Sequence, residues 1–72
     1  MTKEEAIQAM LDGKKVTHRF FMDDEYMFLC DKINNVYQFE DGVEIDAQKF
    51  WGMKMENIED WEEDWEIFEE KK

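Results

Sequence analysis

The chain has 72 residues, a formal net charge of −11 at pH 7, and three Trp, six Phe and two Tyr. This length predicts one small domain, residues 1–72, and the charge opposes direct binding to nucleic acid or to anionic membranes while favouring a basic partner. The single cysteine, Cys30, excludes an intrachain disulfide, and no apolar run approaches membrane-spanning length. We therefore expect a cytoplasmic protein.

The first predicted element is a helix from Thr2 to Asp12. Thr2 and Glu5 have the capping-box spacing, in which the hydroxyl and the carboxylate each accept a backbone N–H of the first turn. Gly13 is expected to end the helix, because glycine adopts the left-handed conformation without strain. One face of the helix is predicted to be apolar and to consist of Ala6, Ile7, Met10 and Leu11.

The middle of the chain predicts a three-stranded meander over residues 25–33, 36–40 and 43–46. The dipeptides that separate these runs, Asn34-Asn35 and Asp41-Gly42, tolerate the positive φ of tight hairpin turns. The first run is apolar on both faces, so we expect it to be a central strand.

Two segments flank the meander. Lys15–Phe21 is predicted to form a strand with Val16, His18 and Phe20 on one face, and a turn is expected at Asp23-Asp24. Ala47–Met55 fits a loop or a short helix that leads into one more strand.

The tail, residues 56–72, contains two competing patterns. Trp61, Trp65 and Phe68 recur at helical spacing, whereas Trp65 and Ile67 alternate as in a strand. The density of Glu favours the helix.

Acidic residues surround the tail tryptophans. A solvated face, an acidic patch that binds protein, and a cation site are the three interpretations. The spacing matches no EF-hand loop and lacks its central glycine, so no metal site is predicted. Aromatic residues ringed by charge are typical of binding surfaces, although the rings equally fit a core. The candidate partner-binding residues are Glu59, Asp60, Trp61, Glu62, Glu63, Asp64 and Glu66.

The basic cluster of the chain is Lys14, Lys15, His18 and Arg19. Such a cluster suits a phosphate or a carboxylate, so His18 and Arg19, together with Trp65, are candidate ligand-binding residues. No nucleophile or acid stands at a catalytic spacing from His18, and the sequence has no Gly-rich phosphate loop, nucleophile elbow or zinc motif. We predict that the protein is not an enzyme and needs no cofactor.

Three short pieces at the two ends of the chain carry a family resemblance: Ala6-Ile7-Gln8-Ala9-Met10, Gly13-Lys14-Lys15-Val16 and Asp64-Trp65-Glu66-Ile67. They resemble the amphipathic helix, the Gly-Lys-Lys-Val run and the closing Asp-Trp-Glu-hydrophobic strand of the Thoeris anti-defence two-like family of small phage proteins. Where that family has an Arg and then a Trp after the Val run, this chain has His18 and Phe21.

The resemblance implies a turn at Glu59–Glu63 and a strand at Trp65–Glu69, and on this ground we predict the strand rather than the helix. It also implies oligomerisation, and sequestration of a cyclic nucleotide immune signal without catalysis. The predicted fold class is α+β, with the N-terminal helix packed on a small antiparallel meander sheet of four to five strands.

The charge and the resemblance together lead to two hypotheses of function. The first is a non-catalytic, phage-type counter-defence inhibitor in the host cytoplasm. Its acidic surface mimics nucleic acid and covers a basic site on a host immune protein, such as a CRISPR or restriction nuclease. The alternative is a sponge for a cyclic nucleotide immune signal.

Overall fold

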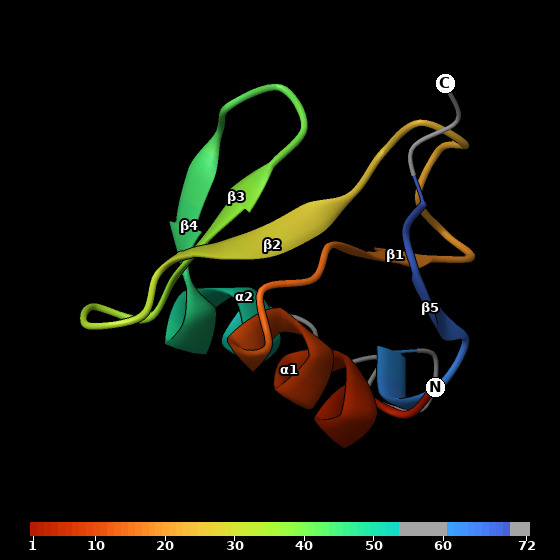
Figure 1. Cartoon of the computed structure of the whole chain (residues 1–72), viewed down its shortest axis with the longest axis horizontal. Helices are drawn as coiled ribbons and strands as arrows, with labels where there is room; N and C mark the ends of the chain where they lie inside the picture. Colours follow the sequence, from red (N-terminus) through yellow and green to blue (C-terminus); the bar gives the residue numbers. More distant parts are fainter. Residues whose placement is uncertain (54–60, 70–72) are drawn as a thin grey trace.

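The computed structural model describes residues 1–53 and 61–69, which form two helices and a five-stranded sheet (Figure 1). The elements in chain order are α1 (Lys3–Leu11), β1 (Val16–His18), β2 (Met27–Asp31), β3 (Val36–Phe39), β4 (Glu44–Asp46), α2 (Ala47–Met53) and β5 (Trp65–Ile67). Every strand pair is antiparallel, and the order across the sheet is β4-β3-β2-β1-β5. The predicted α+β fold is confirmed, and β2 is the central strand as expected.

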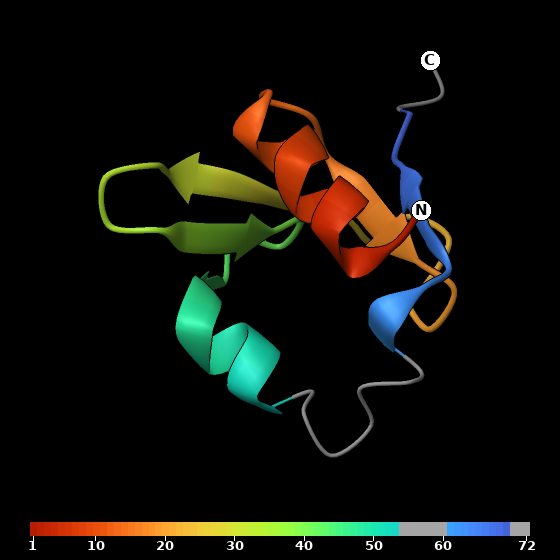
Figure 2. The same cartoon turned by 90° about the horizontal axis from the view of Figure 1, so that it is seen from below.

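Both helices lie on the same face of the sheet (Figures 1 and 2). Helix α1 contacts β1, β2 and β5, whereas α2 contacts β4 and follows it directly in the chain. The strand β5 pairs with β1 at one edge of the sheet, and the backbones of Met1 and Trp65 are hydrogen-bonded to each other there.

The ends of α1 follow from local sequence. The Thr2 hydroxyl accepts the backbone N–H of Glu5 at 3.2 Å, and the Glu5 carboxylate accepts the N–H of Thr2 at 2.9 Å. At the other end Gly13 has φ +87°, and the backbone N–H groups of Gly13 and Lys14 donate to the carbonyls of Met10 and Ala9. This is the Schellman arrangement, and it satisfies carbonyls that the last turn leaves without partners.

The predicted turn residues have the expected conformations, but the two-residue turns were wrong: four residues separate β2 from β3 and β3 from β4. Asn35 has φ +57° and Gly42 has φ +89°, which are the positive values that these turns need. Asp31 stabilises the first turn because its carboxylate accepts the backbone N–H groups of Ile33 and Asn34, each at 3.0 Å.

Asp46 caps α2 in the same way, accepting the N–H groups at positions 48 and 49. The segment expected to be a loop or a short helix is therefore a helix.

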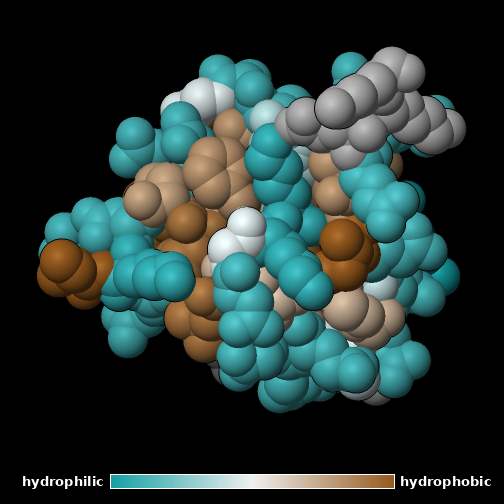
Figure 3. Space-filling model, viewed as in Figure 1, coloured by the Kyte–Doolittle hydropathy of each residue, from teal (hydrophilic) through white to brown (hydrophobic). Residues whose placement is uncertain are grey.

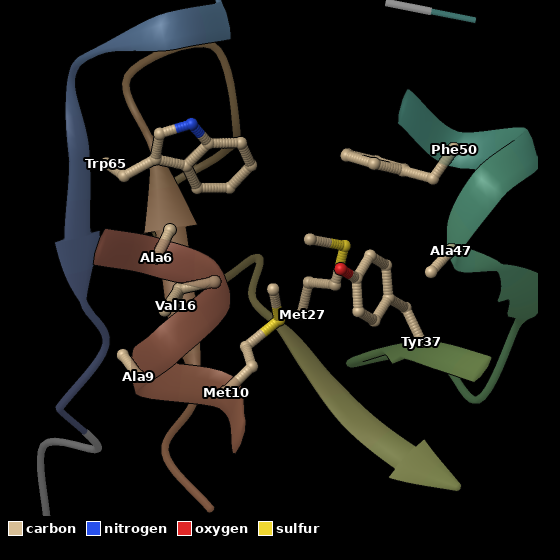
Figure 4. Packing of buried hydrophobic residues seen from close by; sticks show 9 residues of the cluster. All are labelled: Ala6, Ala9, Met10, Val16, Met27, Tyr37, Ala47, Phe50 and Trp65. Carbon is tan, nitrogen blue, oxygen red and sulfur yellow. The ribbon is translucent and has the colours of Figure 1, made fainter. Parts of the chain in front are cut away.

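The core lies between the sheet and the two helices (Figure 4). Side chains from six elements, α1, β1, β2, β3, α2 and β5, converge there. The Trp65 indole of β5 points toward the aromatic rings of β3 and α2. The buried apolar residues are Ala6, Ala9, Met10, Val16, Met27, Tyr37, Ala47, Phe50 and Trp65.

The predicted apolar face of α1 is partly wrong. Ala6 and Met10 are buried, but Leu11 is 44% exposed, and the buried residue that the pattern missed is Ala9. The face that packs against the sheet is rotated toward Ala9 because α1 lies against β5 as well as β1 and β2.

Several strands are shorter than predicted. The first ends at His18, where the Phe21 N–H donates to the His18 carbonyl at 2.8 Å, so Phe20 does not continue the face of Val16 and His18. Val43 precedes β4 and is exposed. In the tail, the predicted strand is present as β5, but Trp61 and Glu62 are helical where a turn was expected.

Replacing Met10 and Leu11 separately by Ala tests which face of α1 is buried. We expect Met10→Ala to lower the free energy of unfolding by about 2–5 kcal/mol, because it leaves a cavity in the core. Leu11→Ala should cost less than about 1 kcal/mol, because its side chain is already half in water. Urea denaturation of both variants is the measurement, and equal losses would contradict the packing of α1.

Candidate functional site

A buried histidine connects β1 to the segment that precedes β5. His18 is only 3% exposed, and its Nε2 lies 2.8 Å from the carbonyl oxygen of Glu63. Its Nδ1 accepts the backbone N–H of Phe20 at 3.2 Å. Because Nδ1 accepts and Nε2 faces a carbonyl, the arrangement requires a neutral imidazole with its hydrogen on Nε2. Both ring nitrogens are engaged in structural hydrogen bonds.

Aromatic rings enclose this imidazole. Trp61 stacks on His18 with ring centroids 4.3 Å apart, and Trp65, which is opposite His18 in the strand register, meets it edge-on at 4.8 Å. The Trp65 side chain is 0% exposed, and its indole N–H donates to the Trp61 carbonyl at 2.8 Å. These contacts place Trp65 in the core, and Trp61 half-buried against it.

One end of the molecule gathers carboxylates from three separate segments of the chain. Figure 1 places the start of α1, the residues before β5 and β5 itself at this end, and Figure 3 shows mostly hydrophilic residues along the same margin. All of these carboxylate residues are exposed except Glu62, which is half-buried. We call this surface the acidic end, and its residues are Glu4, Asp23, Glu62, Glu63, Asp64 and Glu66.

Two carboxylates crowd one another at the acidic end. The pKa of Glu62 is raised, first by a side-chain hydrogen bond with Glu4, then by desolvation and by the negative charge of Glu4; Glu63 adds to the effect and Lys3 opposes it. A raised carboxyl pKa means that the fold disfavours the charged form. At this position the fold therefore places two carboxyl groups close enough to disfavour the charge of Glu62, and Lys3 offsets the effect only in part.

A groove of about 340 Å³ lies beside the acidic end. His18 and Arg19 line it together with the carboxylates of Asp23, Asp64 and Glu66. The Arg19 guanidinium forms an ion pair with Asp64 at 3.3 Å, and both side chains are about half exposed. Asp64 itself has φ +70°, a conformation that Asp and Asn adopt more readily than most residues, and it turns the chain into β5.

The predicted site residues do not all lie at one place. Glu62, Glu63, Asp64 and Glu66 lie together at the acidic end, whereas Glu59 and Asp60 lie outside the described residues.

The candidate ligand residues His18 and Arg19 share one groove. The prediction that Trp65 binds a ligand is wrong, because its ring is fully buried and is not part of the groove surface. Trp61 contributes to the packing around His18 more than to the surface.

Sequence reasoning missed Glu4 and Asp23. Both are far in sequence from the tail, and only the pairing of β5 with β1 brings the tail beside α1 and the β1–β2 connection. Neither residue has a local signal that would have indicated this position.

The fold and this surface define a small α+β protein with one strongly acidic end. No family model, curated protein or solved structure matches the chain. Within residues 1–53 and 61–69, no helix has both the length and the apolar content needed to cross a membrane. In the same ranges, no three His, Cys, Asp or Glu side chains are grouped as ligands for a metal ion.

His18→Phe tests whether the imidazole holds the segment before β5. Phe retains a ring for stacking but leaves the Phe20 N–H and the Glu63 carbonyl without their partner. We expect the free energy of unfolding to fall by about 1–3 kcal/mol. Chemical denaturation gives this value, and ¹⁵N spectra of the parent at pH 7 should show the hydrogen on Nε2. A variant as stable as the parent, or an Nδ1-protonated ring, would contradict this role.

Glu62→Gln tests the repulsion at the acidic end. Because the pKa of Glu62 is raised on folding, its contribution to stability is present below the ordinary carboxyl pKa and is lost as the pH rises through the raised value. We expect the variant to melt at a higher temperature than the parent at pH 7, and the difference to vanish below about pH 4. Glu69→Gln, an exposed position just beyond β5, is the control for charge alone and should give a smaller rise at pH 7.

Proposed function

We propose that the protein is a non-catalytic, phage-type counter-defence inhibitor that acts by binding. Its acidic end takes the place of nucleic acid and covers a basic site on a host immune protein, such as a CRISPR or restriction nuclease. The partner is recognised by complementary charge, which speeds association and selects a positively charged cleft.

The observation that carries this proposal is the crowding of Glu4 and Glu62 within a surface that already has surplus carboxylates. The raised pKa of Glu62 means that its charged form is disfavoured in the fold, so Glu62 adds no stability near neutral pH. A basic partner would relieve the repulsion on binding, as lysines and arginines do when they neutralise phosphates. The overall charge of −11 acts in the same direction.

The alternative function is a sponge for a cyclic nucleotide immune signal. The groove that contains the candidate ligand residues His18 and Arg19 supports it less well than the acidic end supports the first function. Arg19 is paired with Asp64, and Asp23 and Glu66 add negative charge to the same walls. His18 uses both ring nitrogens inside the fold. An anionic ligand would meet more carboxylates than cations there, which favours the first function.

The test is binding to a panel of purified host nucleases that have basic DNA-binding clefts. We expect a member of the panel to bind the protein in competition with DNA, with an affinity that falls at least tenfold between about 50 and about 500 mM salt. The triple variant E62Q/E63Q/E66Q should weaken that binding by about tenfold or more and reduce its salt dependence.

The matched control is E40Q/D41N/E44Q, which removes the same charge from exposed positions around the β3–β4 turn. It should keep the parent affinity within about twofold. Equal losses in the two variants would show that net charge, and not the acidic end, decides binding. An affinity independent of salt would contradict nucleic-acid mimicry.

A further inference from the structure

A second groove, remote from the acidic residues of β5, opens between α1 and α2 and has a volume of about 430 Å³. Ile7 of α1 and Ala47 and Trp51 of α2 supply apolar walls, and Tyr37 of β3 lies between them. The size falls at the lower end of the range for small-molecule sites, which suits one or two fused rings.

The groove contains a buried hydroxyl with an unused hydrogen. The Trp51 indole N–H donates to the Tyr37 hydroxyl oxygen at 2.9 Å, and Tyr37 is only 3% exposed. No described residue accepts the hydrogen of that hydroxyl. Burial raises the pKa of Tyr37, more than the Trp51 hydrogen bond lowers it, so the hydroxyl remains a donor at neutral pH. Its hydrogen is therefore available to an acceptor placed in the groove.

Further groups that favour an acceptor oxygen line the same groove. The Lys3 ammonium lies 5.0 Å from the centroid of the Trp51 ring. Asn35 and Gln48 also line the groove, and their side-chain amides can donate hydrogen bonds. Lys3 is the one cation among the described lining residues, and the whole protein is strongly negative. These charges suit a ligand with a single negative charge and disfavour a multiply charged one.

We propose that this groove binds a small aromatic monocarboxylate. The ring packs among Ile7, Ala47 and Trp51, where an aromatic ligand gains both apolar burial and ring contacts. The carboxylate accepts hydrogen bonds from the Tyr37 hydroxyl and the Lys3 ammonium, which are charge-assisted and therefore strong. Lys3 also acts on Glu62 of the acidic end, but the other groups of this site lie outside that surface, and the proposal does not depend on the function proposed for the acidic end.

The probe is indole-3-acetate, titrated into the full chain while the three tryptophan indole N–H signals are followed by NMR. We expect the Trp51 signal to shift first, because its N–H is bonded to the hydroxyl that the ligand contacts. Lys3→Gln and Tyr37→Phe should each raise the Kd about fivefold or more. Lys49→Gln, which removes an exposed lysine of α2 outside the groove, should change it less than twofold.

Two further ligands test whether the groove selects a single negative charge over no charge and over two charges. Tryptophol, which has the same ring system without the carboxylate, should bind at least fivefold more weakly than indole-3-acetate. The dianionic nucleotide AMP should also bind more weakly. The proposal is overturned if tryptophol binds as well as indole-3-acetate, if AMP binds more tightly, or if Lys3→Gln and Lys49→Gln have the same effect. Saturation that moves only the Trp61 or Trp65 signal would also overturn it.

Discussion

The buried imidazole of His18 joins the C-terminal strand to the sheet, together with the fully buried Trp65 ring and the backbone hydrogen bonds between Met1 and Trp65. Strand β5 has only three residues, and its pairing with β1 alone is a small interaction. His18 adds a hydrogen bond to the Glu63 carbonyl and a stacking contact with Trp61, both just before β5 begins. These contacts hold the segment that carries most of the acidic end. The buried His18 thus helps to fix the position of the surface carboxylates, because a buried polar atom must be hydrogen-bonded to a partner in the fold.

The parts of the fold that local sequence specifies were predictable. The capping box of α1, the glycine that ends it and the two hairpin turns each depend on residues within four positions of one another. Strand β2 could be placed in the centre because both of its faces are apolar. Such features follow from backbone conformation and side-chain alternation, which do not require knowledge of the rest of the chain.

The candidate site was predictable only in part, because its geometry is set by long-range contacts. The tail acids were identified from composition, but their proximity to Glu4 and Asp23 exists only once β5 pairs with β1. The same pairing moves Trp65 from a candidate surface residue into the core. It also buries His18, whose role could not be inferred from a strand pattern, because the partner carbonyl lies 45 residues away. A one-dimensional pattern contains no signal for such contacts.

The aromatic core and the acidic end act in opposite directions on stability, and this opposition bears on function. The rings of His18, Phe21 and Trp51 pack around Trp65, and Trp65 packs on Phe50. These contacts bury a large apolar area for so short a chain. That burial allows the fold to retain carboxylates whose mutual repulsion weakens it. Residues that destabilise the free protein but improve its complex are typical of binding surfaces, where stability and function compete. Glu62 is an example, because its charged form is disfavoured by the neighbouring carboxyl of Glu4 and yet it stands on the acidic end.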